Sequence, residues 1–162
     1  MAWAKNGTQT NGSTTDPIDL TLDSSLQFNF SIWHTLHSGT VNSGLRVGNS
    51  TIDTGNNYAW RHSFAGGTDT TGTSTASYVN LNAPDGDELQ VMYFINIAAE
   101  EKLVIAFGCG ENTSGAGTAP RRHETVGKWT NTSNQIDIIE SYDSGGAGSY
   151  LTDSNLSALG TD

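Results

Sequence analysis

The stretch LQVMYFINIAAEEKLVIAFGC, residues 89–109, decides the fold class of this chain. Its first part, Leu89–Ile97, is apolar on both faces, which is typical of a central strand covered on each side. Residues 98–101 form a short connection, and Leu103–Cys109 follows with apolar residues at every second position. Two such runs joined by a short loop predict a β-hairpin.

Strand patterns with a period of two continue on both sides of this hairpin. In the segment before it, Phe28, Phe30 and Ile32 share one face of a predicted strand. Further strands are predicted within residues 16–23, 26–36, 45–47, 58–62, 76–82, 125–130 and 135–141. The only run of helix formers, residues 98–103, is too short to form a helix alone. About nine short strands between Gly, Asn, Ser and Thr clusters predict an all-β, antiparallel β-sandwich that resembles a jelly roll.

Length and composition indicate one domain. A chain of 162 residues can bury one core, so residues 1–162 are expected to form a single β-sandwich domain. Its ends are polar, and we expect an extended N-terminal arm over about residues 1–15 and a C-terminal docking tail over about 152–162. Charged residues make up only 15% of the chain, which leaves a surface of Thr, Ser, Asn and Gly.

The charge balance excludes several classes of partner. A net charge of -10 argues against nucleic acid and against an anionic membrane surface, because both are bound through many Lys and Arg side chains. No apolar run reaches the length of a transmembrane helix. No apolar segment follows Lys5, so a secretory signal is not expected and the chain is expected to be made in a cytoplasm.

Cysteine, histidine and acidic residues give no strong metal or cofactor pattern. The single cysteine, Cys109, is expected to be a buried, inert thiol. His34 and His37 would point to opposite sides of a strand, which does not suit a zinc site. Calcium binding is one hypothesis for the acidic loops, and ordinary turn chemistry is the alternative. No cofactor is predicted. The acidic residues of these loops are Asp85, Asp87, Glu88 and Asp143.

The segment QIDIIE, residues 135–140, is similar to the E-x-D-x-x-E strand motif of β-glucanases with a concanavalin-like jelly roll. That resemblance implies a nucleophile, a supporting Asp and a general acid/base. The matching positions are Gln135, Asp137 and Glu140, and a glutamine cannot act as the nucleophile. A plain strand is therefore the preferred interpretation, and a glycoside hydrolase is kept as a remote alternative.

A basic cluster stands out in this acidic chain. The segment GAGTAPRRHETVGKW, residues 115–129, contains Arg121, Arg122, His123 and Lys128. It lacks a phosphate-binding motif, so pairing with carboxylates is its expected role. The partners are expected either on a neighbouring subunit or within the same chain. Conceivable acceptors are Glu100, Glu101 and Asp162.

Several segments together resemble a group of small all-β proteins that recur in genomes of tailed phages from aquatic environments. They are MAWAKNGTQT, TGNNYAWRHS, FINIAAEEKLVI, NTSGAGTAPRRHETVGKWTNTSNQI and SNLSALGTD. The resemblance implies a virion component, and it implies no catalytic residues. The expected function is therefore a non-enzymatic phage structural protein, most simply a capsid decoration or cement protein.

Such a protein would act through contacts with itself, as a homo-oligomer such as a trimer, and with the major capsid protein. Trp33 and Trp60 are further candidate anchors, with the core as the alternative for each Trp. A tail-fibre module that binds a glycan or receptor is a second hypothesis, with Tyr58–Trp60 or Tyr142–Tyr150 as sugar-contacting aromatics. The expected interface residues are Trp3, Arg121, Arg122, His123, Lys128 and Trp129.

Overall fold

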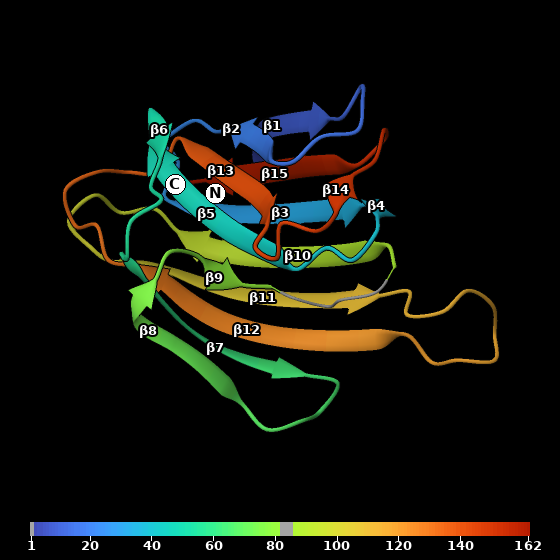
Figure 1. The fold of residues 1–162 in the computed structure, drawn as a ribbon. Helices are drawn as coiled ribbons and strands as arrows, with labels where there is room; N and C mark the ends of the chain where they lie inside the picture. Colours follow the sequence, from blue (N-terminus) through green and yellow to red (C-terminus); the bar gives the residue numbers. More distant parts are fainter. Residues whose placement is uncertain (1, 82–85) are drawn as a thin grey trace.

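The computed structural model describes residues 2–81 and 86–162, and every element in that part of the chain is a β-strand (Figure 1). The described residues hold no helix that is long and apolar enough to cross a membrane. The strands pair antiparallel and form two main sheets packed face to face, so the predicted all-β sandwich is confirmed.

The larger sheet contains eight strands. Their order is β1 (Ala4–Thr10), β15 (Asn155–Thr161), β3 (Phe28–Thr35), β10 (Glu88–Ile95), β11 (Lys102–Gly110), β12 (Arg121–Trp129), β7 (Tyr58–Phe64) and β8 (Thr70–Ala76). The predicted hairpin lies at its centre, where β10 pairs with β11 in a continuous register from Glu88↔Gly110 to Phe94↔Val104.

The smaller sheet covers one face of the larger one (Figure 1). Its strands are β2 (Ile18–Thr21), β13 (Ile138–Asp143), β5 (Ser43–Asn49) and β6 (Thr51–Ile52), with β9 (Val79–Asn80) beside β5. A separate pair consists of β4 (His37–Ser38) and β14 (Ser149–Tyr150).

The two ends of the chain correct the expected arm and tail. β1 and β15 pair with each other, with Thr8 opposite Ser157, and β15 also pairs with β3. Both ends therefore belong to the larger sheet. Within the described residues the structure has fifteen strands, four of them only two residues long, where the sequence predicted about nine.

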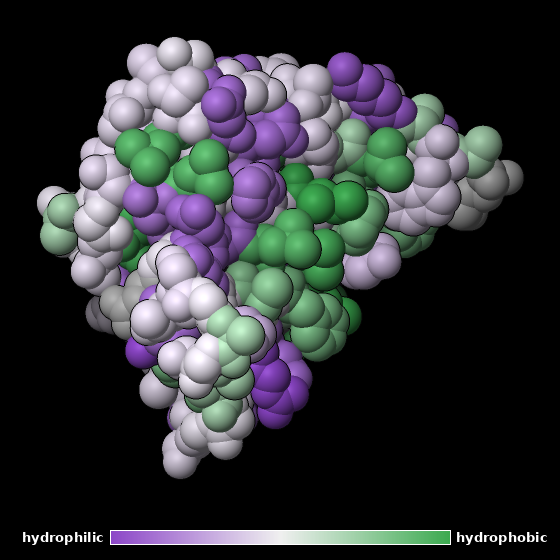
Figure 2. Space-filling model, turned by 90° about the vertical axis from the view of Figure 1, so that its right-hand side faces the viewer, coloured by the Kyte–Doolittle hydropathy of each residue, from purple (hydrophilic) through white to green (hydrophobic). Residues whose placement is uncertain are grey.

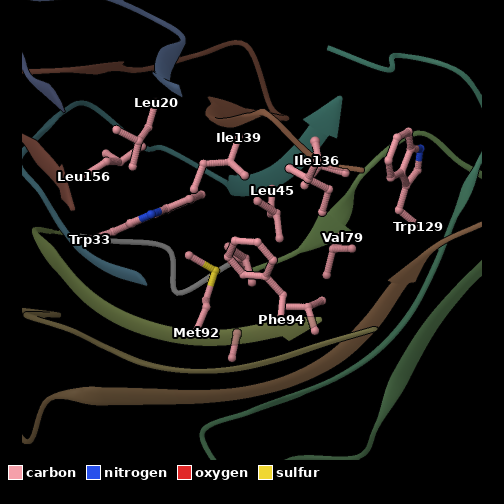
Figure 3. Packing of buried hydrophobic residues seen from close by; sticks show 14 of the residues in the cluster. Leu20, Trp33, Leu45, Val79, Met92, Phe94, Trp129, Ile136, Ile139 and Leu156 are labelled. Carbon is pink, nitrogen blue, oxygen red and sulfur yellow. The ribbon is translucent and has the colours of Figure 1, made fainter. Parts of the chain in front are cut away.

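The hydrophobic core lies between the two sheets (Figure 3). Trp33 and Met92 from the larger sheet face Leu45 and Ile139 from the smaller one, and each of the four is at most 4% exposed. Several polar groups on the same inner face are hydrogen-bonded, as is usual for buried polar groups. For example, the Trp33 indole donates to Oγ of Ser31 at 2.8 Å.

Candidate interaction surface

The larger sheet has a second surface, directed away from the smaller sheet, which we call the outer face. Large apolar side chains occupy it, and each exposes between 37% and 52% of its surface. They are Trp3, Phe28, Ile32, Leu89, Tyr93, Leu103, Ile105, Phe107, Val126 and Leu159. Apolar surface also forms a continuous area bordered by polar side chains in the side view of Figure 2.

The three central strands direct their more apolar sides outward. In β11, Leu103, Ile105 and Phe107 are exposed, whereas Lys102 and Ala106 face the core. β3 and β10 behave in the same way, since their buried positions include polar residues. The expectation that Leu89–Ile97 is covered on each side is therefore wrong for this chain taken alone, because only its inner face is covered.

Cross-strand register joins the outer side chains into rows. Leu159 stands opposite Phe30, Phe30 opposite Tyr93, Tyr93 opposite Ile105, and Ile105 opposite Val126. The Phe30 and Tyr93 rings lie 4.7 Å apart between centroids. This central row therefore runs unbroken across five strands and contains no charge.

A shallow hollow interrupts the face near the N-terminus. It has a volume of about 450 Å³ and an apolar lining that includes Trp3, Phe28, Tyr93, Leu103 and Ile105. Trp3 is thus the predicted interface residue that lies on the outer face as an exposed aromatic side chain.

Charged residues lie at the margins of the outer face. Arg122 pairs with Glu124 at 3.3 Å, and Lys128 pairs with Glu101 at 2.6 Å. Arg61 is similarly paired on the neighbouring strand β7, while Lys5 lies on the edge strand β1. Arg122 and Lys128 thus find carboxylate partners within the chain. Exposed pairs of this kind contribute little to stability, typically below about 1 kcal/mol each.

The basic cluster is divided between the two faces of β12. Arg122 and Lys128 point outward, whereas His123 and Trp129 are buried, with exposures of 1% and 3%. Arg121 is half-buried, with its guanidinium 5.6 Å from the Phe64 ring centroid. His123 and Trp129 are therefore corrected from surface residues to interior residues, because successive strand residues point to opposite faces.

His123 lies in an unusual environment for a histidine. Burial, assisted by the nearby His62 ring, lowers the pKa of His123 to about 4. Neither ring nitrogen of His123 has a hydrogen-bond partner within the described part of the chain. The neutral imidazole therefore acts as a packing group at neutral pH.

The three residues that match the glucanase motif, Gln135, Asp137 and Glu140, make hydrogen bonds or ion pairs within the chain. Gln135 donates to the backbone carbonyl of Asn96 at 2.9 Å, and both Gln135 and Asp137 precede strand β13. Asp137 accepts a hydrogen bond from the Ser50 N–H at 2.6 Å. Glu140 instead pairs with Arg46 at 3.4 Å. Burial raises the pKa of Glu140, although Arg46 opposes that shift.

The aromatic residues considered for sugar binding are largely inaccessible. Tyr58 and Tyr150 are core residues with exposures of 2% and 0%. Tyr142 is half-buried, and its ring is covered by the Arg46 guanidinium at 3.5 Å from the centroid. Trp60 packs against the core from a half-buried position. These positions thus serve packing, which corrects their use as sugar platforms.

Cys109 differs from its expectation, because it is exposed at the end of β11 rather than buried. It stands opposite Leu89 and Arg122 in the larger sheet, so its thiol belongs to the outer face.

The acidic loops are used in turns where the structure describes them. Burial alone would raise the pKa of Asp143, but backbone N–H donors from Asn42, Gly145, Ala147 and Gly148 hold it below its usual value. Asp87 accepts the His37 N–H at 2.9 Å. The structure brings together no three candidate metal ligands in residues 2–81 and 86–162. Asp85, named for calcium, lies outside the described residues.

The described geometry defines the class as an all-β protein of packed antiparallel sheets with an apolar outer face. Neither a protein-family model nor a curated protein matches the chain. Among solved structures, an alginate lyase from Alteromonas sp.272 aligns over 98% of this chain and 91% of its own length. Its sequence identity is 9% and its TM-score is 0.18, which is too low to carry an argument.

The outer face was not predicted as a site, although the sequence contains its signal. The alternation of Phe28, Phe30 and Ile32, with Asn29 and Ser31 between them, identifies an apolar side of β3. Sequence periodicity cannot tell which of the two sides of a strand faces the core when both carry apolar residues.

Proposed function

We propose that this protein is a non-enzymatic structural component of a phage virion, most simply a decoration protein on the capsid surface. It would act through contacts with copies of itself and with other virion proteins such as the major capsid protein, and the outer face would be buried in that assembly. A tail appendage is the alternative position, because the same face serves either assembly.

The exposed apolar area of the outer face carries this proposal. Four of the ten side chains are aromatic, with roughly 150–250 Å² each, and six are smaller aliphatic ones, so at about half exposure they leave roughly 600–900 Å² in water. The largest apolar patch of a typical monomer covers only roughly 300–600 Å². A soluble chain that retains a larger patch is expected to bury it in an assembly.

The resemblance to aquatic phage proteins supports the virion as the place of that assembly. The neutral central row and the marginal charges also suit a protein contact, since interfaces have apolar centres and polar rims.

Quantitative mass spectrometry of purified particles tests this proposal. We expect a copy number similar to that of the major capsid protein for a decoration role, and a few copies per particle for a tail appendage. Absence of the chain from purified particles would contradict both positions.

A binding assay with matched variants tests the surface itself. The purified chain would be added to particles that lack it. Ile105→Lys places a charge in the central row, and we expect it to abolish binding. Thr21→Lys, at an exposed position of β2 in the smaller sheet, adds the same charge and should bind like the wild type. Equal binding by both variants would exclude the outer face.

A further inference from the structure

We infer that the outer face is covered by a second copy of this chain, giving a two-fold dimer in which two eight-stranded sheets stack face to face. This inference rests on the proposed assembly role of the outer face and names the partner that covers it.

Area supports a second copy as the occupant. A standard protein interface buries about 800 Å² on each partner, and the exposed apolar side chains offer a similar area, roughly 600–900 Å². A single extended peptide would cover one row of side chains and leave the side chains of the neighbouring strands exposed to solvent. A second sheet of the same size covers all five strands of the central row together.

Geometry also suits a copy. The central row, from Leu159 through Tyr93 to Val126, belongs to consecutive strands of one continuous sheet. Sheets pack face to face about 10 Å apart, with their strands rotated by about 30°. A two-fold axis near Tyr93 and Ile105 would bring each row against its own counterpart, as a self-complementary interface requires.

Charge pairing on the outer face limits local repulsion between two copies. Each chain carries a net charge of -10, so two copies repel at long range. On the outer face, however, Glu124 and Glu101 are paired with Arg122 and Lys128. Because these pairs lie beside the central row, stacking two rows buries no unpaired carboxylate.

The uncovered apolar sides of β3, β10 and β11 agree with this arrangement. Residues such as Phe107 and Ile105 remain about half exposed in the single chain. In the dimer, Leu89–Ile97 would be covered on both faces, as its composition predicts for a central strand.

Light scattering coupled to size separation tests the dimer on the full chain. At about 100 μM and physiological salt, we expect wild type and Thr21→Lys to have twice the chain mass. Ile105→Lys should have the single-chain mass, because a buried charge in the centre of an interface weakens binding by about 100-fold or more. Ile105→Ser provides a milder second variant, and urea unfolding checks that both remain folded.

The possible outcomes separate this inference from the proposed function. A monomeric wild type would overturn the second copy, while particle binding that Ile105→Lys abolishes would still support the proposed function. A dimer that persists in both Ile105 variants would show that another surface joins the copies. A trimer would overturn the two-fold arrangement.

Discussion

The environment of His123 depends on a glycine in the neighbouring strand. Gly108 stands opposite His123 in the β11–β12 register, and a Cβ atom at that glycine would collide with Nε2 of the imidazole. The sequence shows both residues, but it gives no sign that they meet, because register between strands depends on the whole sheet. The same limit led to the expectation that His123 lies at the surface.

Because His123 is buried, we expect the folded protein to lose stability as the pH falls. The unfolded chain binds a proton at this residue near pH 6.5, whereas the folded chain does so only near pH 4. Between those values the unfolded state therefore holds more protons, and stability falls as the pH falls. From pH 7 to pH 5, this residue should remove about 2 kcal/mol of unfolding free energy.

Urea unfolding of dilute protein at both pH values measures this loss. His123→Gln should lose less stability between pH 7 and pH 5 than wild type does. His34→Gln, at an exposed position of β3, is the matched control and should behave like wild type. An unchanged pH dependence in His123→Gln would show that the buried imidazole is not responsible.

At the scale of elements, sequence periodicity predicted those strands in which apolar and polar residues alternate. The β10–β11 hairpin is confirmed, and β2 and β7 lie where their patterns placed them. β8, with the sequence TTGTSTA, was missed because it is almost entirely polar. Hydrogen bonding to β7 along the edge of the sheet, rather than its own composition, holds that strand in place.

Lys102 fixes the loop of the central hairpin. Its side chain is 2% exposed, and its ammonium group donates to backbone carbonyls of Ala98, Glu100 and Asn131 at 2.7–3.1 Å. These bonds join the β10–β11 loop to the segment after β12. From the sequence alone, Lys102 would be expected to be solvent-exposed, since buried lysines are rare.

Replacing Lys102 tests this role. Lys102→Met keeps the aliphatic stem but leaves three carbonyls without their charged donor, so we expect a loss of about 2–4 kcal/mol in unfolding free energy. Lys5→Met, at an exposed position of β1, should change stability by less than about 0.5 kcal/mol. Equal stabilities of the two variants in urea unfolding would show that the loop does not depend on Lys102.

For the whole molecule, composition and periodicity predicted the sandwich but not which surface is left open. The choice depends on how β1 and β15 join the larger sheet and where the smaller sheet ends, and both are long-range pairings. The larger sheet is therefore covered on one side by the smaller sheet, and it carries apolar side chains on both sides. We propose that the second side is buried when the protein assembles.

Hydroxyl-radical footprinting measures this burial most directly, because it reports the solvent exposure of individual side chains. Samples would be compared at a concentration where the chain is monomeric and at one where it is assembled. We predict that oxidation of Tyr93, Leu103 and Ile105 falls at least about fivefold on assembly, while that of Tyr142 in the smaller sheet stays constant. Assembly that leaves Tyr93 and Ile105 as reactive as before would contradict the account.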